Sequence, residues 1–341
     1  MVTIYDIAKQ ANVSAMTVSR VINNTGRISD KTRAKVRHVM EELNYVPNAM
    51  ARSLVLQKTN IVSLLVTDIT NPFYTTLARG AEDAARAHGY KLLLGNSDED
   101  LIKEKEYIET ILSTRVDGVL LTPASDYSKE QLEALKRHGT PFVAIDRDVP
   151  GIVCDAVVGD SVGGARKLID HLVQLGHRVI ALVGGTFDVS TARERHDGYR
   201  EALAANGLLY DERFVFQTGY RLHDMEQAVE RLLALEPAPT AILAGNNLQA
   251  LGLLQSFRRR GIETPGQMSI VTFDSLGYRD LIDPLFTTAE QPAYQFGELG
   301  ITMLIERIEG RAEIQPRRKV LPNELIIGSS TSEPTAARTH N

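Results

Sequence analysis

The sequence predicts an α/β protein with a small three-helix head at its N-terminus, followed by two lobes that are each built on a doubly wound parallel sheet. Two observations lead to this prediction. Short apolar runs alternate with amphipathic stretches from residue 60 onward, and repeated β-α-β units of this kind form parallel sheets with right-handed crossovers. The chain length of 341 residues exceeds what one compact core accommodates and suits a small module plus two lobes.

The predicted strands are the short apolar runs, and the predicted helices are the amphipathic stretches between them. The runs cover residues 61–66, 90–94, 116–121, 142–145, 179–183, 241–244 and 269–273. Several helical stretches end in a glycine just before the next run, namely Gly89, Gly139, Gly176, Gly207 and Gly261. Glycine is favoured just past a helix because it adopts left-handed dihedral angles without a steric penalty.

Three short helices are predicted within residues 3–44. Apolar residues recur at i, i+3, i+4 and i+7 along the first helix and predict one buried face. These residues are Ile4, Ile7, Ala8 and Ala11. Thr3 and Asp6 have the spacing of a capping box at the start of this helix, and Ser14 and Ser29 are placed to cap the second and third helices. Pro47 ends the region, so residues 1–46 are predicted to form the head.

The second helix has two opposite faces, as a helix that enters the major groove of DNA requires. Its apolar face consists of Val18, Val21 and Ile22, and its other face of Met16, Ser19, Arg20 and Asn23. We expect Arg20 to grip a guanine through two hydrogen bonds, and Ala15 and Met16 to contact a thymine methyl group. Candidates for phosphate contacts are Ser14, Thr17 and Ser19. An ordinary three-helix bundle with a solvated polar face is the alternative.

Charge is distributed unevenly along the chain. The formal net charge is −5, yet residues 1–60 hold nine Lys or Arg and four acidic side chains, which amounts to +5. The remainder holds 29 basic and 39 acidic side chains, which amounts to −10. A basic head on an acidic body is typical of a head that binds a polyanion, with chance clustering as the alternative.

Composition and missing motifs narrow the class of protein. Cys154 is the only cysteine, so we expect neither an intramolecular disulfide nor a multi-cysteine metal site. The sequence has no run of 18 or more apolar residues and no recognisable secretory leader, so we expect a cytoplasmic protein without a membrane span. It also has no G-x-x-x-x-G-K-[S/T], H-E-x-x-H or G-x-S-x-G motif. We therefore expect no catalytic residues, metal or cofactor, and an enzyme is the disfavoured alternative.

Residues 3–54 resemble the DNA-binding headpiece of the lactose-repressor family, and the resemblance continues to about residue 328. The segments TIYDIA, NVS, TVSRVIN, LNYVPN and ARSL carry it. It implies that Ala15, Met16 and Arg20 select the operator, and the first two differ from the lactose repressor's own pair. It also implies a hinge helix within a linker at residues 47–59. A helix of this length is too short to be stable on its own. Leu54 falls where the family inserts a wedge into the minor groove; packing between two hinge helices is its alternative role.

The resemblance also implies the full set of DNA contacts and the oligomeric state. The expected contacts are Thr3, Ser14, Ala15, Met16, Thr17, Ser19, Arg20, Asn23, Asn48, Ala51 and Leu54. A pseudo-palindromic operator requires two headpieces to span two half-sites. The tail has no apolar heptad that would join two dimers. We therefore expect a homodimer on double-stranded DNA.

Polar side chains follow several of the predicted strands, at the ends where open parallel sheets bind their ligands. Asp68 follows the first apolar run, Asp146 and Arg147 follow the fourth, and Asn246 and Asp274 follow the last two. A single polar residue at a strand end means little. Several that point polar groups toward the same edge predict a binding cleft.

The resemblance places an effector site at this cleft, between two lobes that are similar to periplasmic binding proteins. The residues that it implies are Phe73, Asp146, Arg147, Asp160, Arg195, Tyr220, Asn246, Asp274 and Gln291. Such a set suits a sugar, or a sugar acid with Arg147 as counter-charge, and a purine is the alternative. Arg195 could instead pair with a neighbouring acid, and Asp160 could only cap the helix after it. Asn247 stands where the family usually has an aspartate, so the electrostatics beside Asn246 are expected to differ.

The sequence therefore predicts a repressor of carbohydrate-metabolism genes whose operator affinity is switched by a small effector. The lobes are expected to cover residues 60–160 with 290–318, and 161–289 with 319–328. Residues 329–341 are expected to be a frayed polar tail. The alternatives are a family member that a partner protein co-regulates and a solute-binding protein without a regulatory role.

Overall fold

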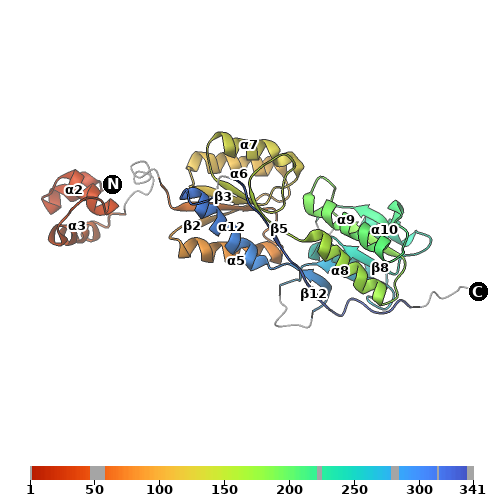
Figure 1. Cartoon of the computed structure of the whole chain (residues 1–341). Coiled ribbons are helices and arrows are strands. Elements are labelled where there is room, and N and C mark those ends of the chain that lie inside the picture. The colour runs from red at the N-terminus through yellow and green to blue at the C-terminus, as the bar shows by residue number, and fades with distance from the viewer. Residues whose placement is uncertain (1, 47–57, 221–224, 278–283, 313–314, 336–341) are drawn as a thin grey trace, which may run out of the picture. The chain divides into compact units, whose positions relative to one another are not determined.

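The computed structural model describes residues 2–46, 58–220, 225–277, 284–312 and 315–335. The chain forms two compact units, residues 1–59 and 60–341 (Figure 1). The expected hinge contacts Asn48, Ala51 and Leu54 lie outside the described residues. None of the helices in these ranges combines the length and the apolar character that crossing a membrane demands.

The described part of the N-terminal unit, residues 2–46, contains three helices, α1 (Ile4–Ala11), α2 (Ala15–Asn23) and α3 (Asp30–Glu42), as the sequence predicted. The capping box at α1 is present, with the Thr3 hydroxyl donating to the Asp6 carboxylate at 2.7 Å. Ser14 and Ser29 accept hydrogen bonds from the first turns of α2 and α3. The core joins the apolar faces of all three helices through Ile7, Ala11, Val18, Val21, Val36 and Val39.

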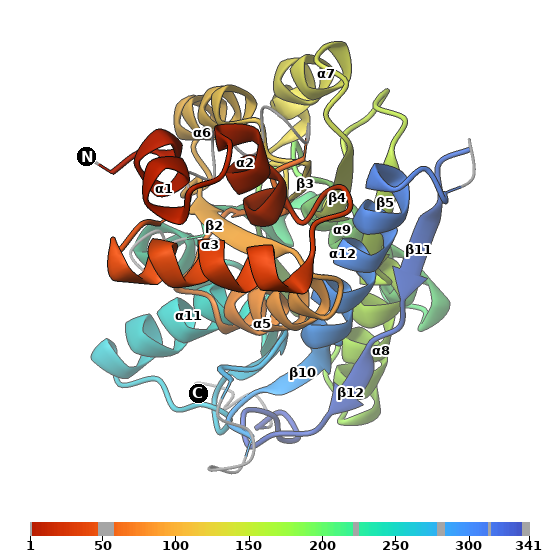
Figure 2. The same cartoon turned by 90° about the vertical axis from the view of Figure 1, so that its left-hand side faces the viewer.

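The first lobe of the second unit is built on a six-stranded parallel sheet in the order β11-β5-β4-β3-β1-β2. Its strands are β1 (Ile61–Val66), β2 (Lys91–Asn96), β3 (Gly118–Leu121), β4 (Phe142–Asp146), β5 (Asp155–Gly159) and β11 (Arg318–Leu321). Figure 2 shows β11 at the outer edge of the sheet, next to β5.

Helices cover both faces of this sheet. On one face lie α5 (Pro72–Ala87) and α12 (Ala293–Ile308), and on the other lie α6 (Leu101–Thr114) and α7 (Lys129–Arg137) (Figure 1). A 3-10 turn, η1 (Asp126–Ser128), comes directly before α7. Successive strand residues point to opposite faces, so Leu64 packs with α5 and α12 whereas Leu65 packs with α6 and α7. A strand buried on both faces reads as a continuous apolar run, which is why the sequence revealed β1.

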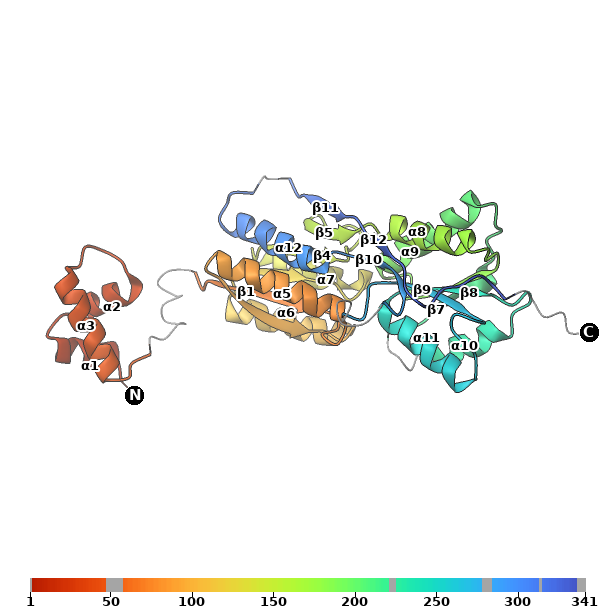
Figure 3. The same ribbon diagram turned by 90° about the horizontal axis from the view of Figure 1, so that it is seen from below.

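The second lobe repeats the plan, with strand order β12-β10-β9-β8-β6-β7. Its strands are β6 (Ile180–Gly184), β7 (Val215–Gln217), β8 (Ala241–Ala244), β9 (Ser269–Phe273), β10 (Thr287–Glu290) and β12 (Glu324–Ile326). Helices α8 (Ser161–Gln174) and α9 (Ser190–Ala205) cover one face of this sheet, and α10 (Met225–Leu233) and α11 (Asn247–Arg259) cover the other (Figure 3). A 3-10 turn, η2 (Glu212–Phe214), comes directly before β7. The edge strand β12 is antiparallel, so this sheet is not wholly parallel.

The structure differs from the sequence prediction in its smallest elements. Strands β5, β7, β10, β11 and β12 were not predicted, because each mixes polar with apolar residues and shows no continuous apolar run. The sequence predicted that the chain passes back from the first lobe to the second at residue 319. This boundary is too early, because β11, which extends to Leu321, still pairs with β5 of the first lobe.

The segment after residue 328 is not frayed where the structure describes it. Ser330 is buried, and its backbone carbonyl accepts a hydrogen bond from Ile270 N at 3.0 Å. The carbonyl oxygen of Ser332 lies 2.9 Å from the His177 ring. Residues 329–335 therefore dock on the second lobe through backbone groups and through the hydroxyls of Ser330 and Thr331, which a polar composition does not reveal.

Both lobes have the same strand order around their first strand. In the first lobe β2 lies on one side of β1 and β3 on the other, and in the second lobe β7 and β8 flank β6 in the same way. The order in which strands are added therefore reverses between β1 and β3 and between β6 and β8. Crevices outside the carboxyl ends of the strands at such reversals are where open α/β sheets bind ligands. The fold therefore brings two such crevices into one unit.

Candidate functional site

The exposed side of α2 carries the residues that the sequence assigned to DNA reading. Met16 is 64% exposed, which leaves a large apolar side chain in solvent on the face opposite the core. Arg20 is also exposed, and its aliphatic stem lies against Gly26, a residue with φ of +71°. Asn23 Nδ2 donates to Ser19 Oγ at 3.2 Å, which orders the end of this face. This side of α2 can therefore enter a groove without disturbing the core.

The remaining expected headpiece contacts stand at helix starts. Ser14 Oγ accepts from Thr17 N at 3.1 Å and lies 2.9 Å from the Thr17 hydroxyl. Thr3 and Ser14 are exposed, and Ala15 is half-buried. Thr3 and Ser14 thus already serve as helix caps, and their exposed hydroxyl groups remain within reach of a phosphate.

The carboxyl ends of both sheets line one buried space, here named the inner cleft. The first lobe supplies Asp68, Asn71, Phe73, Tyr74, Glu99, Asp146 and Arg147, and the rest of the chain supplies Thr191, Arg195, Tyr220, Asn246, Leu248, Asp274 and Gln291. Eight of the nine expected effector residues thus lie together. The ninth, Asp160, lies outside this lining and caps α8, accepting from Gly163 N at 2.9 Å.

Three carboxylates reach the inner cleft from residues with left-handed backbone angles. The φ angles are +58° at Glu99, +66° at Asp146 and +60° at Asp274. Such angles cost a non-glycine residue on the order of 1–3 kcal/mol and concentrate at functional sites. The turns after β2, β4 and β9 therefore hold these side chains in place at a cost to backbone stability.

Tyr74 and Asp146 form a buried pair on the floor of the first lobe. The Tyr74 hydroxyl donates to Asp146 Oδ2 at 2.9 Å. The other oxygen, Asp146 Oδ1, is buried without a hydrogen-bond partner among the described residues. Burial raises the pKa of the Asp146 carboxyl, although Arg147 and Arg195 oppose this. Phe73 packs edge-on against Tyr74, with ring centroids 5.1 Å apart.

Arg195 and Asp274 provide the facing charges from the second lobe. Arg195 Nη1 donates to Gly245 O at 2.5 Å, and its guanidinium lies 4.1 Å from the centroid of the Phe273 ring. Gln291 donates to the Asp274 carboxylate from its backbone nitrogen at 3.1 Å and from Nε2 at 2.9 Å. Burial raises the pKa of Asp274 to about 7, while Arg195 acts in the opposite direction. Asp274 therefore titrates near neutral pH.

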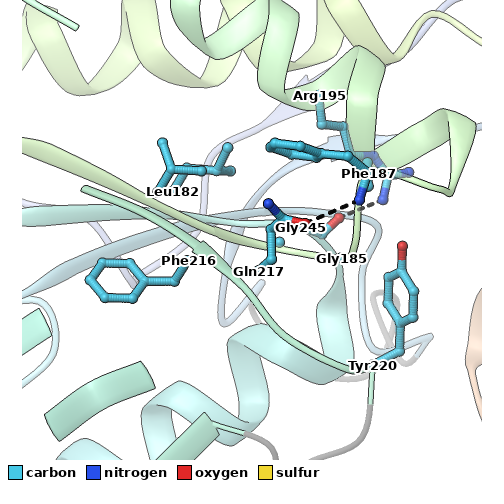
Figure 4. Close-up of a pocket in the computed structure, with 11 residues that line it drawn as sticks. Leu182, Gly185, Phe187, Arg195, Phe216, Gln217, Tyr220 and Gly245 are labelled. Atoms are coloured by element: carbon cyan, nitrogen blue, oxygen red, sulfur yellow. Dashed lines mark hydrogen bonds between the residues drawn. The ribbon is translucent and has the colours of Figure 1, made fainter. Parts of the chain in front are cut away.

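Tyr220 forms a wall of the inner cleft and of a small apolar pocket behind it. Figure 4 shows its hydroxyl pointing toward Gly185 and the Arg195 guanidinium. A Cβ at Gly185 would lie 1.9 Å from that hydroxyl oxygen, so only glycine leaves room for the ring there. The Arg147 guanidinium lies 5.2 Å from the centroid of the Tyr220 ring. Burial raises the pKa of Tyr220 to about 12, so the hydroxyl stays protonated.

The inner cleft has a volume of about 30 Å³, enough for about two water molecules. A wider cavity of about 610 Å³ adjoins it and shares Asp68, Glu99 and Tyr220 with its lining. A larger ligand reaches the inner cleft only when the lobes or Tyr220 move.

Asp68 was among the polar residues predicted at strand ends. Five further cleft residues were not predicted as site residues from the sequence: Asn71, Tyr74, Glu99, Thr191 and Leu248. Tyr74 follows Phe73 on α5, so the start of that helix was a usable signal. Glu99 lies three residues beyond the end of β2, in a turn with left-handed dihedral angles that the residue types there do not predict. Thr191 and Leu248 lie in first turns of helices, where the sequence shows only ordinary amphipathic character.

Both units of the chain match families of known proteins. A family described as "Bacterial regulatory proteins, lacI family" matches residues 3–48. A second, "Periplasmic binding proteins and sugar binding domain of LacI family", matches residues 59–328. The "HTH-type transcriptional regulator DegA" of Bacillus subtilis (strain 168) is 38% identical over 336 residues, which cover 97% of this chain and 98% of that protein.

Solved structures agree with this assignment over almost the whole chain. The lac repressor dimer bound to operator and the anti-inducer ONPF matches with a TM-score of 0.81 at 26% identity, covering 97% of this chain and 99% of that one. A complex of the transcriptional regulator CelR with cellobiose matches with a TM-score of 0.72 at 31% identity, covering 97% and 100%. The chain therefore belongs to the LacI family of bacterial regulatory proteins and is a DNA-binding repressor controlled by an effector.

Proposed function

We propose that the protein is a repressor of carbohydrate-metabolism genes whose operator affinity is switched by a sugar bound in the inner cleft. The observation that carries this proposal is a set of four buried polar atoms without hydrogen-bond partners among the described residues. They are Asp146 Oδ1, Arg147 Nε, Arg195 Nε and the Tyr220 hydroxyl. Leaving such atoms unpaired costs about 1–3 kcal/mol each. Donors and acceptors interleaved beside an aromatic ring match a polyhydroxylated ring with one apolar face.

In this proposal the sugar lies against Phe73 and Tyr220. Its hydroxyl groups bind the polar residues Asp146, Arg147, Arg195, Asn246, Asp274 and Gln291. Asp160 is left out of the set because its carboxylate already caps α8. Groups from both lobes converge on the inner cleft, so a ligand there contacts both lobes and differs in its affinity for different arrangements of the lobes. Effector binding shifts the lobe equilibrium only by this difference in affinity.

We also propose that the protein binds a pseudo-palindromic operator as a homodimer. It would do so in the cytoplasm, where that DNA lies. The edge strand β2 offers a surface for a second copy, because Leu93 and Leu94 are 50% and 51% exposed there. Two exposed leucines on an unpaired sheet edge invite association with another chain. Within each headpiece, Ala15, Met16 and Arg20 of α2 would read bases in one half-site.

The test is a thermal-shift screen of the full-length protein against sugars, sugar acids and purines, followed by calorimetry on each compound that raises the melting temperature. The proposal expects a sugar to bind and to change the affinity for a selected operator in a gel-shift assay. Arg195→Ala is expected to retain operator binding and to lose the response to that sugar. Stabilisation by nucleobases alone, or an unchanged response in Arg195→Ala, would overturn the proposal.

A further inference from the structure

Arg147 is the cationic group of the first lobe that faces the inner cleft, and a carboxylate already holds it. Glu99 accepts from Arg147 Nη1 at 2.6 Å and from Nη2 at 2.8 Å, a two-pronged ion pair. Nη1 also donates to Ala124 O at 3.0 Å. The Arg147 side chain is 5% exposed, so water screens this pair little. Although burial alone would lower it, Glu99 raises the pKa of the Arg147 guanidinium.

The backbone around Glu99 is shaped for this contact. Asp98 and Glu99 have successive φ angles of +55° and +58°. The Glu99 amide donates to Thr67 O at 3.2 Å, which fixes the turn to the end of β1. As a result the two neighbouring carboxylates diverge: Asp98 pairs with Lys103 at 2.5 Å, whereas Glu99 turns to Arg147. Two strained residues in a row are retained where they set the direction of a functional side chain.

The pair leaves the Nε–H group of Arg147 available toward the cleft. Its Nε is buried without a hydrogen-bond partner among the described residues, and lies 3.8 Å from Asp146 Oδ2. With its terminal nitrogens bound to a carboxylate, Arg147 offers an N–H group and no free positive charge. An N–H of this kind suits a hydroxyl or ring oxygen.

The other charges of the inner cleft are also unfavourable to anions. The lining contains the carboxylates of Asp68, Glu99, Asp146 and Asp274 against the guanidinium groups of Arg147 and Arg195. Even with Asp274 partly protonated near pH 7, the formal balance is negative, so an added carboxylate or phosphate would meet like charges there. Like-charge juxtaposition of this kind suppresses binding of the wrong ligand.

We propose that Glu99 is the specificity-determining residue of the effector site: by neutralising Arg147 it makes the cleft select uncharged sugars over sugar acids and sugar phosphates. This rests on the proposed function and narrows its ligand class. Glu99 itself acts through Arg147 and positions it. The role of counter-charge for an acid, which the sequence alone suggested for Arg147, is already taken by Glu99.

The test compares each neutral sugar with an acid that keeps its ring on the full-length protein, using D-glucose with D-glucuronate and D-galactose with D-galacturonate, together with every sugar that the thermal-shift screen identifies. Wild-type protein is expected to prefer the neutral member by at least about tenfold. Glu99→Gln, which keeps the shape and removes the charge, is expected to shrink this ratio because the Arg147 charge is released. Asp98→Asn is the matched control, since Asp98 has the same backbone conformation but pairs outside the inner cleft.

A second probe, inorganic sulfate, needs no known effector. At equal ionic strength, replacing chloride by sulfate is expected to raise the melting temperature of Glu99→Gln more than that of wild type or Asp98→Asn, which report the general stabilising effect of sulfate. Equal wild-type affinity for a sugar and its acid, or a sulfate response in Glu99→Gln no larger than in Asp98→Asn, would overturn the inference. If no sugar binds wild type while Glu99→Gln gains sulfate binding, the proposed function fails and the role of Glu99 stands.

Discussion

Asn247 of the second lobe donates from Nδ2 to Asn71 Oδ1 of the first lobe at 3.0 Å. The same Nδ2 group donates to Ser275 O at 2.8 Å, and Asn247 is fully buried. Asn71 Oδ1 also accepts from Phe73 N as the cap of α5. The amide at position 247 therefore links the start of α5 to the start of α11, which an aspartate there cannot do with its acceptor oxygens.

Asn247→Asp is expected to destabilise the protein by about 1–3 kcal/mol, because it places a carboxylate against two acceptors. The measurement is urea unfolding at pH 8. Asn71→Asp is the matched control: it keeps an acceptor for both Asn247 and Phe73, so its effect is expected to be smaller. Equal losses in the two variants would show that the direction of the hydrogen bond does not matter.

Asp126 and Arg193 form a second link between the lobes, at the rim of the wider cavity. Arg193 donates to the Asp126 carboxylate at 2.5 and 3.2 Å, and Asp126 N donates to Asp188 O at 2.8 Å. Both side chains are about one-third exposed, so Asp126→Asn is expected to weaken closure by only about 0.5–1 kcal/mol. Small-angle scattering of the unliganded protein would report the shift toward an open form. The exchange Asp126→Arg with Arg193→Asp is expected to restore closure; failure of the exchange would argue against an electrostatic link.

Asp274 gives the ligand-free protein a specific dependence on pH. Its pKa is raised from 3.8 to about 7, so the folded state holds a proton that the unfolded state releases. The resulting stabilisation is complete below pH 3.8 and is lost as pH rises through about 7. Relative to Asp274→Asn, wild type is expected to lose roughly 2–4 kcal/mol of unfolding free energy between pH 4 and pH 8. Parallel pH curves for the two proteins, from urea unfolding at each pH, would contradict this.

Arg20 is expected to determine sequence preference more than general DNA affinity. Arg20→Ala should weaken binding to a selected operator by about 1–3 kcal/mol and relax the preference at one base pair. Fluorescence anisotropy with operator and with unrelated DNA separates the two effects, and circular dichroism checks the fold. An equal loss on both DNAs, with a smaller salt dependence, would reassign Arg20 to a phosphate contact.

Leu93 and Leu94 are expected to hold two copies of the chain together. Aspartate at either position should move the protein from dimer to monomer in sedimentation experiments, because a charge on an associating sheet edge opposes pairing. Leu209→Asp is the control, since Leu209 is 95% exposed on the second lobe away from β2. A dimer that persists in both edge variants would remove β2 from the interface.

Much of the fold was predictable because buried strands read as apolar runs and amphipathic helices carry their own periodicity. The strands β1, β8 and β9 begin and end where the sequence predicted, since each is a buried apolar run. The five glycines expected just past helices all have positive φ. Strands such as β11 and β12 were not predictable, because a few mixed residues become a strand only when a partner strand is already in place.

By itself the sequence determined the three-helix head, the two lobes and the strand ends that converge on a cleft, because local periodicity and caps encode these features. Only the tertiary structure decided what the cleft residues do. It made Asn247 a donor that joins the lobes, and it paired Arg147 with Glu99, a residue that no local pattern marks. Charge and hydrogen bonding depend on neighbours 48 or more residues away, and such neighbours exist only after the chain has folded.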